Sequence, residues 1–274
     1  MTEAELPVVT HNPWRRLRQY TDARIGLGRA GVSLSTAELL AFQLAHAQAQ
    51  DAVHFPLDIA ALLRLLAEVP AIAALGNALR LHSQAPDRVT YLQRPDLGRS
   101  LSQASVAGLQ SLQQAVKEPP DLALVIADGL SSRAVQQNAV PVIEHFLSDL
   151  AAQCPELRMA PPILVEQGRV AIGDEVGHLL GARQVVVFIG ERPGLSSPDS
   201  LGIYLTYGPE PGLPDARRNC ISNIRPAGLS SGQASQRLLY LIQEAARLKL
   251  SGVALKDRSA EVTIGTGNQN NFLL

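Results

Sequence analysis

Three polar turns carry the side chains of this chain that are best placed to contact a ligand. Asp128–Ser131 and Gly190–Gly194 each follow a short apolar run, and Cys220–Asn223 belongs to a third such segment. These turns offer carboxylate, guanidinium, hydroxyl and thiol groups, which bind ligands through hydrogen bonds and charge. No G-x-S-x-G, Walker A or H-E-x-x-H motif accompanies them. The turns therefore indicate ligand binding rather than a self-contained catalytic centre.

The six histidines and two cysteines are scattered along the chain and match no metal-binding spacing. His46 and His145 fall within predicted helices, where a core or surface role is more common than catalysis. Cys154 and Cys220 are far apart, so they predict no disulfide framework, and a reducing compartment is expected. Cys220 taken alone is typical of a small buried hydrophobic residue.

Other candidate residues have an ordinary structural alternative. Asp128 is expected to be the N-cap of the helix that follows its turn. Glu191 and Arg192 form either a surface pair of little energetic value or, on a loop constrained by Pro193, a ligand contact. The charged turn at residues 94–99 is either solvated or a subunit contact, because arginine is favoured in interfaces.

Residues 26–31 match the G-x-G-x-x-G motif of dinucleotide-binding sites, but their surroundings do not fit such a site. A dinucleotide site requires a strand before the glycines and a helix that begins at the third one. Here a charged, helix-like segment precedes them, and the next helix is capped only at Ser35. We expect a glycine-rich loop between helices.

The elements that position the three turns follow from hydrophobic spacing. Residues 13 to about 90 are expected to be helical, with Ser35 and Glu38 forming a capping box. From residue 101, short apolar runs alternate with helices, which is typical of parallel strands covered on both faces. The expected strands lie at residues 122–127, 163–165, 185–189, 203–207 and 219–224, and the expected helices at 101–116, 134–152, 168–181 and 233–250, the last stopped at Gly252.

This pattern predicts an α/β fold with a helical N-terminal region and a doubly wound, mostly parallel sheet. We expect three parts: residues 1–100, residues 101–255 and a flexible tail at residues 256–274. In such sheets, ligands bind at the carboxyl ends of the strands, where the three polar turns are expected to meet.

Composition excludes several classes of protein. The 274 residues are 46% hydrophobic, too apolar for a disordered chain. A net charge of −1 and 4% aromatic residues argue against a nucleic-acid partner, which needs basic surface or stacking platforms. The sequence shows no secretory signal and no apolar run of about 20 residues, so we expect no membrane association and a cytoplasmic protein.

Five segments together resemble the small (light) subunit of ethanolamine ammonia-lyase. They occur in the order and approximate spacing of that family, and the match runs from about Trp14 to Val253. The segments are Tyr91–Arg99, Val125–Ser131, Gly168–Val170, Gly190–Leu195 and Cys220–Ile224.

The resemblance implies a Rossmann-like, cobalamin-binding domain at residues 101–255, in an enzyme that converts ethanolamine to acetaldehyde and ammonia with adenosylcobalamin. It also implies a large-subunit partner that holds the substrate, a hetero-oligomer of several heterodimers, and no activity in the isolated chain. Family members keep the cofactor's own base as the lower cobalt ligand. This agrees with His178, which has Val176 where the D-x-H-x-x-G cobalamin motif has aspartate.

Carried over residue by residue, the family's small-subunit cobalamin contacts fall on Val170, Glu191 and Cys220. Neither a cobalt ligand nor a catalytic residue is expected. Asp128, Ser131 and Arg192 are secondary candidates in neighbouring loops. Some family members carry an N-terminal extension associated with bacterial microcompartments. Only about a dozen residues precede the match here, so the cytoplasm is the expected location and a microcompartment is the alternative.

Two other functions stay open on the residues alone. One is a stand-alone Rossmann-like module that binds a nucleotide or another small molecule in the same crevice. The other is a purely structural subunit that stabilises the large chain.

Overall fold

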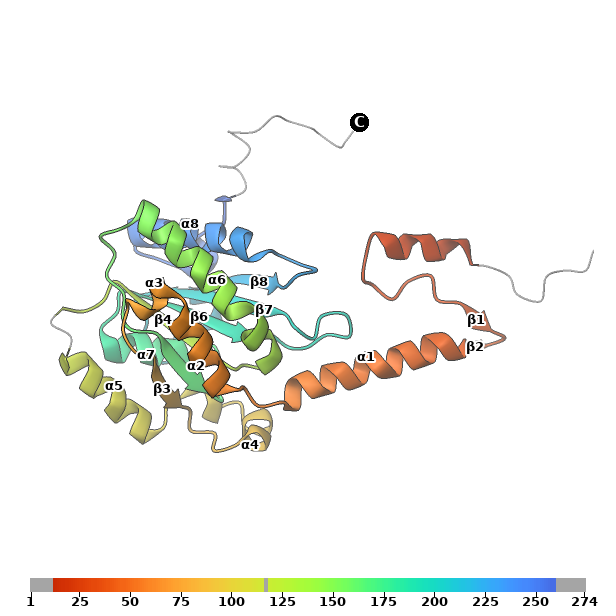
Figure 1. Cartoon of the computed structure of the whole chain (residues 1–274), viewed down its shortest axis with the longest axis horizontal. Helices are drawn as coiled ribbons and strands as arrows, with labels where there is room; N and C mark the ends of the chain where they lie inside the picture. Colours follow the sequence, from red (N-terminus) through yellow and green to blue (C-terminus); the bar gives the residue numbers. More distant parts are fainter. Residues whose placement is uncertain (1–11, 116–117, 260–274) are drawn as a thin grey trace, which may run out of the picture.

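A six-stranded sheet forms the centre of the computed structural model, which describes residues 12–115 and 118–259 (Figure 1). The strand order is β3-β5-β4-β6-β7-β8. All neighbours pair in parallel except β7, which is antiparallel to both β6 and β8. The bounds are β3 Leu79–His82, β4 Leu122–Ala127, β5 Ile163–Glu166, β6 Gln184–Gly190, β7 Leu201–Tyr207 and β8 Arg218–Ile224. The predicted α/β fold with a mostly parallel sheet is confirmed.

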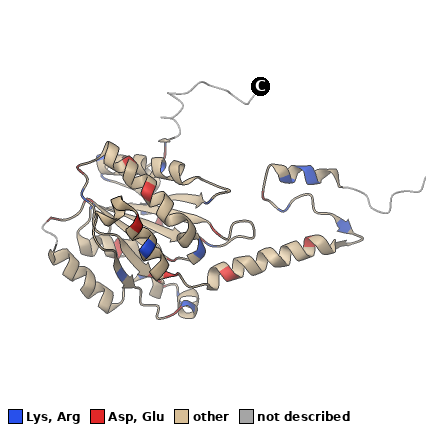
Figure 2. Ribbon diagram, in the orientation of Figure 1, with Lys and Arg blue, Asp and Glu red and all other residues tan. Residues whose placement is uncertain are grey.

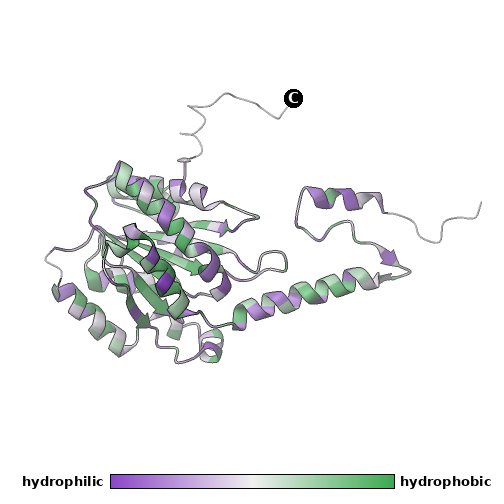
Figure 3. Ribbon diagram, viewed as in Figure 1, coloured by the Kyte–Doolittle hydropathy of each residue, from purple (hydrophilic) through white to green (hydrophobic). Residues whose placement is uncertain are grey.

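The central strands explain why the sequence pattern is so clear there. Every residue of β4 and β6 is buried, and both strands are apolar apart from Gln184 at the start of β6 (Figure 3). Successive side chains of β4 point to opposite faces: Leu122, Leu124 and Ile126 belong to one core cluster, and the residues between them belong to the other.

Helices cover both faces of the sheet (Figure 1). One cluster packs beneath α2 (Ile59–Glu68), α3 (Pro70–Ala73), α6 (Ser132–Gln153) and α8 (Ser231–Leu248). The other packs beneath α5 (Gln103–Ala115) and α7 (Ile172–Leu180). The short α4 (Arg88–Gln93) and the 3₁₀ turn η2 (Leu97–Arg99) follow β3. The sheet is thus buried on both sides, which leaves its strand ends for ligands.

An N-terminal arm, residues 12–54, extends away from this body (Figure 1). It contains η1 (Pro13–Gln19), the hairpin strands β1 (Arg29–Ala30) and β2 (Ser33–Leu34), and the long helix α1 (Thr36–His54). The arm contacts the body at its base, where Arg88 Nε donates to the carbonyl of Val53 at 2.7 Å. Nearer its start, Asp22 forms a 3.5 Å ion pair with Arg225, just beyond β8.

The N-terminal half departs from its expected structure in two places. Residues 79–82, within the stretch expected to be helical, form edge strand β3, so the sheet begins before the expected boundary at residue 101. Ser35 is the N-cap of α1, but its side chain makes no capping hydrogen bond. Glu38 instead accepts a 2.8 Å hydrogen bond from Arg18, so the predicted capping box is wrong. The glycines of residues 26–31 lie between helices η1 and α1, as predicted, in the segment that contains the β1–β2 hairpin.

The C-terminal half follows the expectations more closely. Gly181 ends α7 in a left-handed conformation, as predicted. Helix α8 ends at Leu248 with Lys249 in that conformation, so the stop predicted at Gly252 is wrong. Of the expected tail, only residues 256–259 lie within the described chain. No helix in the described ranges is long and apolar enough to cross a membrane.

Two phenylalanines on helices distinguish the core from the arm. Phe146 of α6 is fully buried against the sheet, and Phe42 of α1 is 39% exposed. We expect Phe146→Ala to lower the free energy of unfolding by about 3–5 kcal/mol, because it leaves a cavity in a close-packed core. Phe42→Ala, the matched control, should cost less than about 1 kcal/mol. Urea unfolding of both variants measures the difference, and equal losses would contradict this assignment of core and arm.

Candidate functional site

A cavity of about 420 Å³ opens at the carboxyl ends of β4, β5 and β6. Its walls come from α4, the turn after β4, the loop between β5 and α7, and the ends of β6 and β8. The lining residues are Tyr91, Gly129, Leu130, Arg169, Val170, Ile189, Gly190, Glu191, Arg192, Tyr204 and Ser222. The cavity therefore lies where the strand pattern predicts a ligand site.

The structure brings two of the three predicted cofactor contacts into this cavity. Val170 lies on the loop before α7, and Glu191 directly follows β6; both line the wall. Cys220 does not line it. It lies on β8 directly opposite Tyr204, which does, and its thiol interacts with that tyrosine. The three residues therefore occur in one neighbourhood, with Cys220 beside Tyr204 on the adjacent strand.

Glu191 has one carboxylate oxygen engaged within the chain. Its Oε2 accepts hydrogen bonds from Ser200 Oγ at 2.5 Å and from the backbone N–H of Asn223 at 3.3 Å. Its own N–H donates to the carbonyl of Ser200 at 2.9 Å. Oε1 accepts no hydrogen bond from any described residue, so the carboxylate can bind a ligand donor without losing its anchor.

Tyr91 forms the floor of the cavity between two arginines. The guanidinium carbons of Arg169 and Arg88 lie 4.1 and 4.7 Å from its ring centroid, within cation–π range. Its hydroxyl donates to the carbonyl of Gly168 at 3.1 Å. Burial raises the pKa of Tyr91 above its usual value, so it stays a neutral donor. Arg169 Nε and Arg88 Nη2 are buried without a hydrogen-bond partner in the described chain.

Asp128 is buried beneath this floor and is not the helix cap that its position predicts. Ser131 is the N-cap of α6 and accepts from the N–H of Ala134 at 3.2 Å. The carboxylate of Asp128 instead accepts from the N–H groups of Gln167 and Gly168, each at 3.0 Å. It also forms a 3.5 Å ion pair with Arg88. Long-range partners thus replace the local capping role.

The turn after β4 and the end of β6 are in direct backbone contact. The N–H of Leu130 donates to the carbonyl of Gly190 at 2.9 Å. A Cβ on Gly129, which has φ +60°, would lie 2.3 Å from that carbonyl oxygen, so only glycine fits there. The loops that carry Val170 and Glu191 are therefore joined through the turn that begins with Asp128.

Sequence reasoning missed Arg88 and Tyr204 at this site. Tyr204 lies in a predicted strand, but only the β7–β8 register places it beside Cys220. Arg88 stands in a stretch expected to be helical, remote from any motif, and no local signal distinguishes it. Both residues are identified only by tertiary packing.

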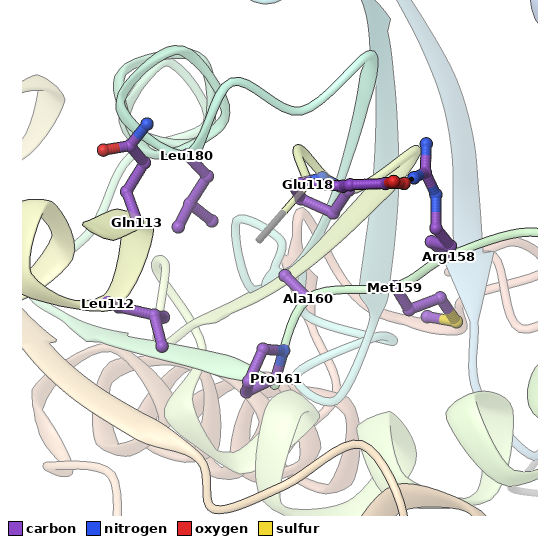
Figure 4. Close-up of a pocket in the computed structure, with 9 residues that line it drawn as sticks. Leu112, Gln113, Glu118, Arg158, Met159, Ala160, Pro161 and Leu180 are labelled. Atoms are coloured by element: carbon purple, nitrogen blue, oxygen red, sulfur yellow. Dashed lines mark ion pairs between the residues drawn. The ribbon is translucent and has the colours of Figure 1, made fainter. Parts of the chain in front are cut away.

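A second cavity, of about 380 Å³, lies at the opposite end of the strands (Figure 4). Leu112, Met159 and Leu180 give it an apolar lining, and the ion pair of Glu118 and Arg158 lies at its edge. Neither cavity contains a metal site, because no group of three or more His, Cys, Asp or Glu in the described chain could hold an ion. The carboxyl-end cavity is the one that gathers the predicted residues.

Comparison with known proteins identifies the family of this chain. The family model "Ethanolamine ammonia-lyase light chain (EutC)" matches residues 11–256. This chain belongs to that family. Ethanolamine ammonia-lyase small subunits from Pseudomonas fluorescens, Ralstonia nicotianae and Azotobacter vinelandii are 55, 57 and 54% identical to it. The alignments cover 97–98% of this chain and 96–97% of theirs. This small subunit thus aligns with its relatives over almost its whole length, which confirms the resemblance stated from the motifs.

The buried carboxylate predicts a pH-dependent stability for this small subunit. Burial raises the pKa of Asp128 to about 6, against the opposing effects of Arg88 and the backbone donors. The folded state therefore binds this proton more tightly than the unfolded state, and this contribution to stability is lost as the pH rises through about 6. From pH 7 to pH 5, we expect the wild type to gain about 1 kcal/mol relative to Asp128→Asn, which cannot titrate.

Urea unfolding of the two proteins at several pH values measures this difference. The comparison cancels the titration of all other groups. A difference that stays constant between pH 5 and pH 7 would show that Asp128 titrates outside this range.

Proposed function

We propose that this small subunit forms one wall of an adenosylcobalamin site that the large subunit of ethanolamine ammonia-lyase completes. The enzyme would convert ethanolamine to acetaldehyde and ammonia. The observation that carries the proposal is the convergence of Val170 and Glu191 in one cavity, with Cys220 next to Tyr204 of its wall. Family membership independently supports the reaction and the partner.

The size of the cavity favours a shared site. Pockets of about 300–1,000 Å³ enclose most of a drug-sized ligand. At about 420 Å³, this cavity can take only an edge of a molecule as large as a cobalamin. The rest of such a ligand would need a second surface, which a large subunit supplies.

The chemistry of the wall fits an amide-rich cofactor with an anionic tail. Val170, Leu130 and Ile189 offer apolar contact to a macrocycle edge. The open oxygen of Glu191 can accept from amide N–H groups, and the partnerless Nε of Arg169 can donate to an acceptor such as a phosphodiester oxygen. Cys220 is not suited to ligate cobalt, because loss of hydration raises the pKa of its thiol.

Binding and orientation are the roles we assign to this chain. Adenosylcobalamin would supply the radical chemistry, and the protein around such a cofactor supplies binding, orientation and electrostatics. The described residues of the cavity present no nucleophile with an adjacent general base, so we place substrate binding on the large subunit. This division assigns Val170 to packing, Glu191 to hydrogen bonding and Cys220 to the support of Tyr204.

The N-terminal arm supports a role in assembly. Large apolar side chains on it are exposed, including Trp14, Tyr20, Leu40 and Leu44. Polar and apolar residues are mixed along α1 (Figure 3), and its large apolar side chains face water, where contact with a partner would cover them. The arm also carries a concentration of positive charge on Arg15, Arg16, Arg18, Arg24 and Arg29 (Figure 2). A hetero-oligomer of several heterodimers, located in the cytoplasm or in a bacterial microcompartment, stays our prediction.

Reconstitution tests the division of labour. We expect no acetaldehyde from ethanolamine with this chain and adenosylcobalamin alone, because we place substrate binding on the large subunit and the described residues of the cavity present no nucleophile with an adjacent general base. Activity should appear when the large subunit is added, as measured by a coupled acetaldehyde assay. Turnover by this chain alone would contradict the proposal.

Substitutions in the wall test the cofactor site. In the reconstituted complex, Glu191→Gln should weaken adenosylcobalamin binding by about tenfold, because a charge-assisted hydrogen bond is lost. Cys220→Trp should weaken it as well, by displacing Tyr204. Glu156→Gln is the matched control, since Glu156 is an exposed carboxylate beside a cavity away from this site. Equilibrium dialysis gives the dissociation constants, and unchanged values for both wall variants would favour a purely structural subunit.

A further inference from the structure

We infer that Asp128 is a positioning residue that holds the Gln167–Val170 loop and the Gly190–Glu191 segment in the arrangement that receives the cofactor. The inference rests on the proposed function of this cavity. Asp128 does not line the cavity itself, so it would act entirely through its neighbours.

The first link runs from Asp128 to Val170. The carboxylate accepts from the N–H groups of Gln167 and Gly168, which are the two residues before Arg169. Gln167 has φ 55°, a left-handed conformation that a non-glycine residue rarely adopts. The two hydrogen bonds offset this strain, because they form only when both N–H groups point back towards β4. Without them the loop is free to relax, and Val170 moves with it.

The second link runs from the same turn to Glu191. Leu130, two residues after Asp128, donates to the carbonyl of Gly190, the residue before Glu191. The missing side chains of Gly129 and Gly190 allow the two backbones to touch. A displacement of the turn is therefore transmitted to the carboxylate that we propose as a hydrogen-bond acceptor for the cofactor.

Arg88 is the third link and balances the charge. Its Nη1 lies 3.5 Å from Asp128 and donates to the carbonyl of Gly129 at 2.8 Å. Its Nε bonds Val53 at the base of the arm. The other titratable groups of this cluster are Tyr91 on α4, which interacts with Asp128, and Arg169 on the loop after β5, which lies over the Tyr91 ring. Ionised Asp128 is thus the only acidic group in a cluster of two arginines and a tyrosine.

Protonation of Asp128 would remove an acceptor and the partner charge of Arg88. Since burial raises its pKa to about 6, the links should weaken as the pH falls through this value. Cofactor affinity is then expected above about pH 6 and should decline below it. This is opposite to the direction of its effect on folding stability, because the neutral acid is easier to bury but holds the loop less well.

Adenosylcobalamin binding to the complex with the large subunit tests the inference. Asp128→Asn should raise the dissociation constant at pH 7.5 by about tenfold or more, as measured by equilibrium dialysis. Asp121→Asn is the matched control, because Asp121 immediately precedes the same strand β4 at its other end. We expect the control to stay within about twofold of wild type.

A second substitution separates positioning from general stability. In Asp128→Asn/Gln167→Gly, the left-handed conformation at residue 167 no longer carries a Cβ penalty. The double variant should recover at least about threefold of the lost affinity without a matching gain in thermal stability. A merely structural role predicts no recovery.

Each outcome bears on one of the two claims. If wild-type complex binds no adenosylcobalamin, the proposed function fails. If wild type binds but Asp128→Asn binds equally well, or Gln167→Gly restores nothing, the positioning role fails and the proposed function stands. Should Asp128→Asn not fold, the wild-type dissociation constant between pH 5 and pH 8 decides: a rise below about pH 6 that Asp121→Asn shares supports the role, and a flat profile overturns it.

Discussion

The buried charge of Asp128 is the constraint on which the geometry of the site depends. A carboxylate taken out of water is costly unless its oxygens are hydrogen-bonded and its charge is balanced. Here the backbone of residues 167 and 168 supplies the hydrogen bonds, and Arg88 supplies the charge. These groups come from α4 and from the loop after β5. If either segment moved away from β4, the buried carboxylate would lose hydrogen bonds or its balancing charge. The cavity walls are therefore fixed by one interaction behind them.

The strands of the sheet differ in how well their positions could be predicted from the sequence. Strands β4 and β6 were predictable because both faces are buried, which forces a continuous aliphatic run into the sequence. Strand β3 was not, because at the sheet edge it needs only a short run in which Arg80 and His82 alternate with Leu79 and Leu81. Four such residues within a region rich in leucine and alanine cannot be told from helix by periodicity.

Two carboxylates that local sequence predicts to cap helices bind distant partners instead. Asp128 and Glu38 both occupy positions where a capping role is the ordinary expectation. Asp128 binds a loop about 40 residues away, and Glu38 binds Arg18 across the arm. Capping is worth about 1 kcal/mol, and a charge-assisted bond to a distant partner exceeds it. The strand pattern thus predicted where the cavity lies, and of the three residues that the family resemblance implied, Val170 and Glu191 line it and Cys220 does not. The network beneath them could not be predicted, because no local spacing encodes it.

Several features of this chain are more easily explained in a complex than in an isolated monomer. The cavity is too small and open to enclose a large cofactor, buried guanidinium nitrogens of Arg88 and Arg169 lack partners, and α1 leaves Leu40 and Leu44 in water. Each is a cost that a monomer would have no reason to retain. Arg88 joins the cavity to the arm by bonding both Gly129 and Val53. Binding of a partner along the arm would therefore act on the same cluster that positions the cavity wall. This connects assembly to cofactor binding through a single side chain.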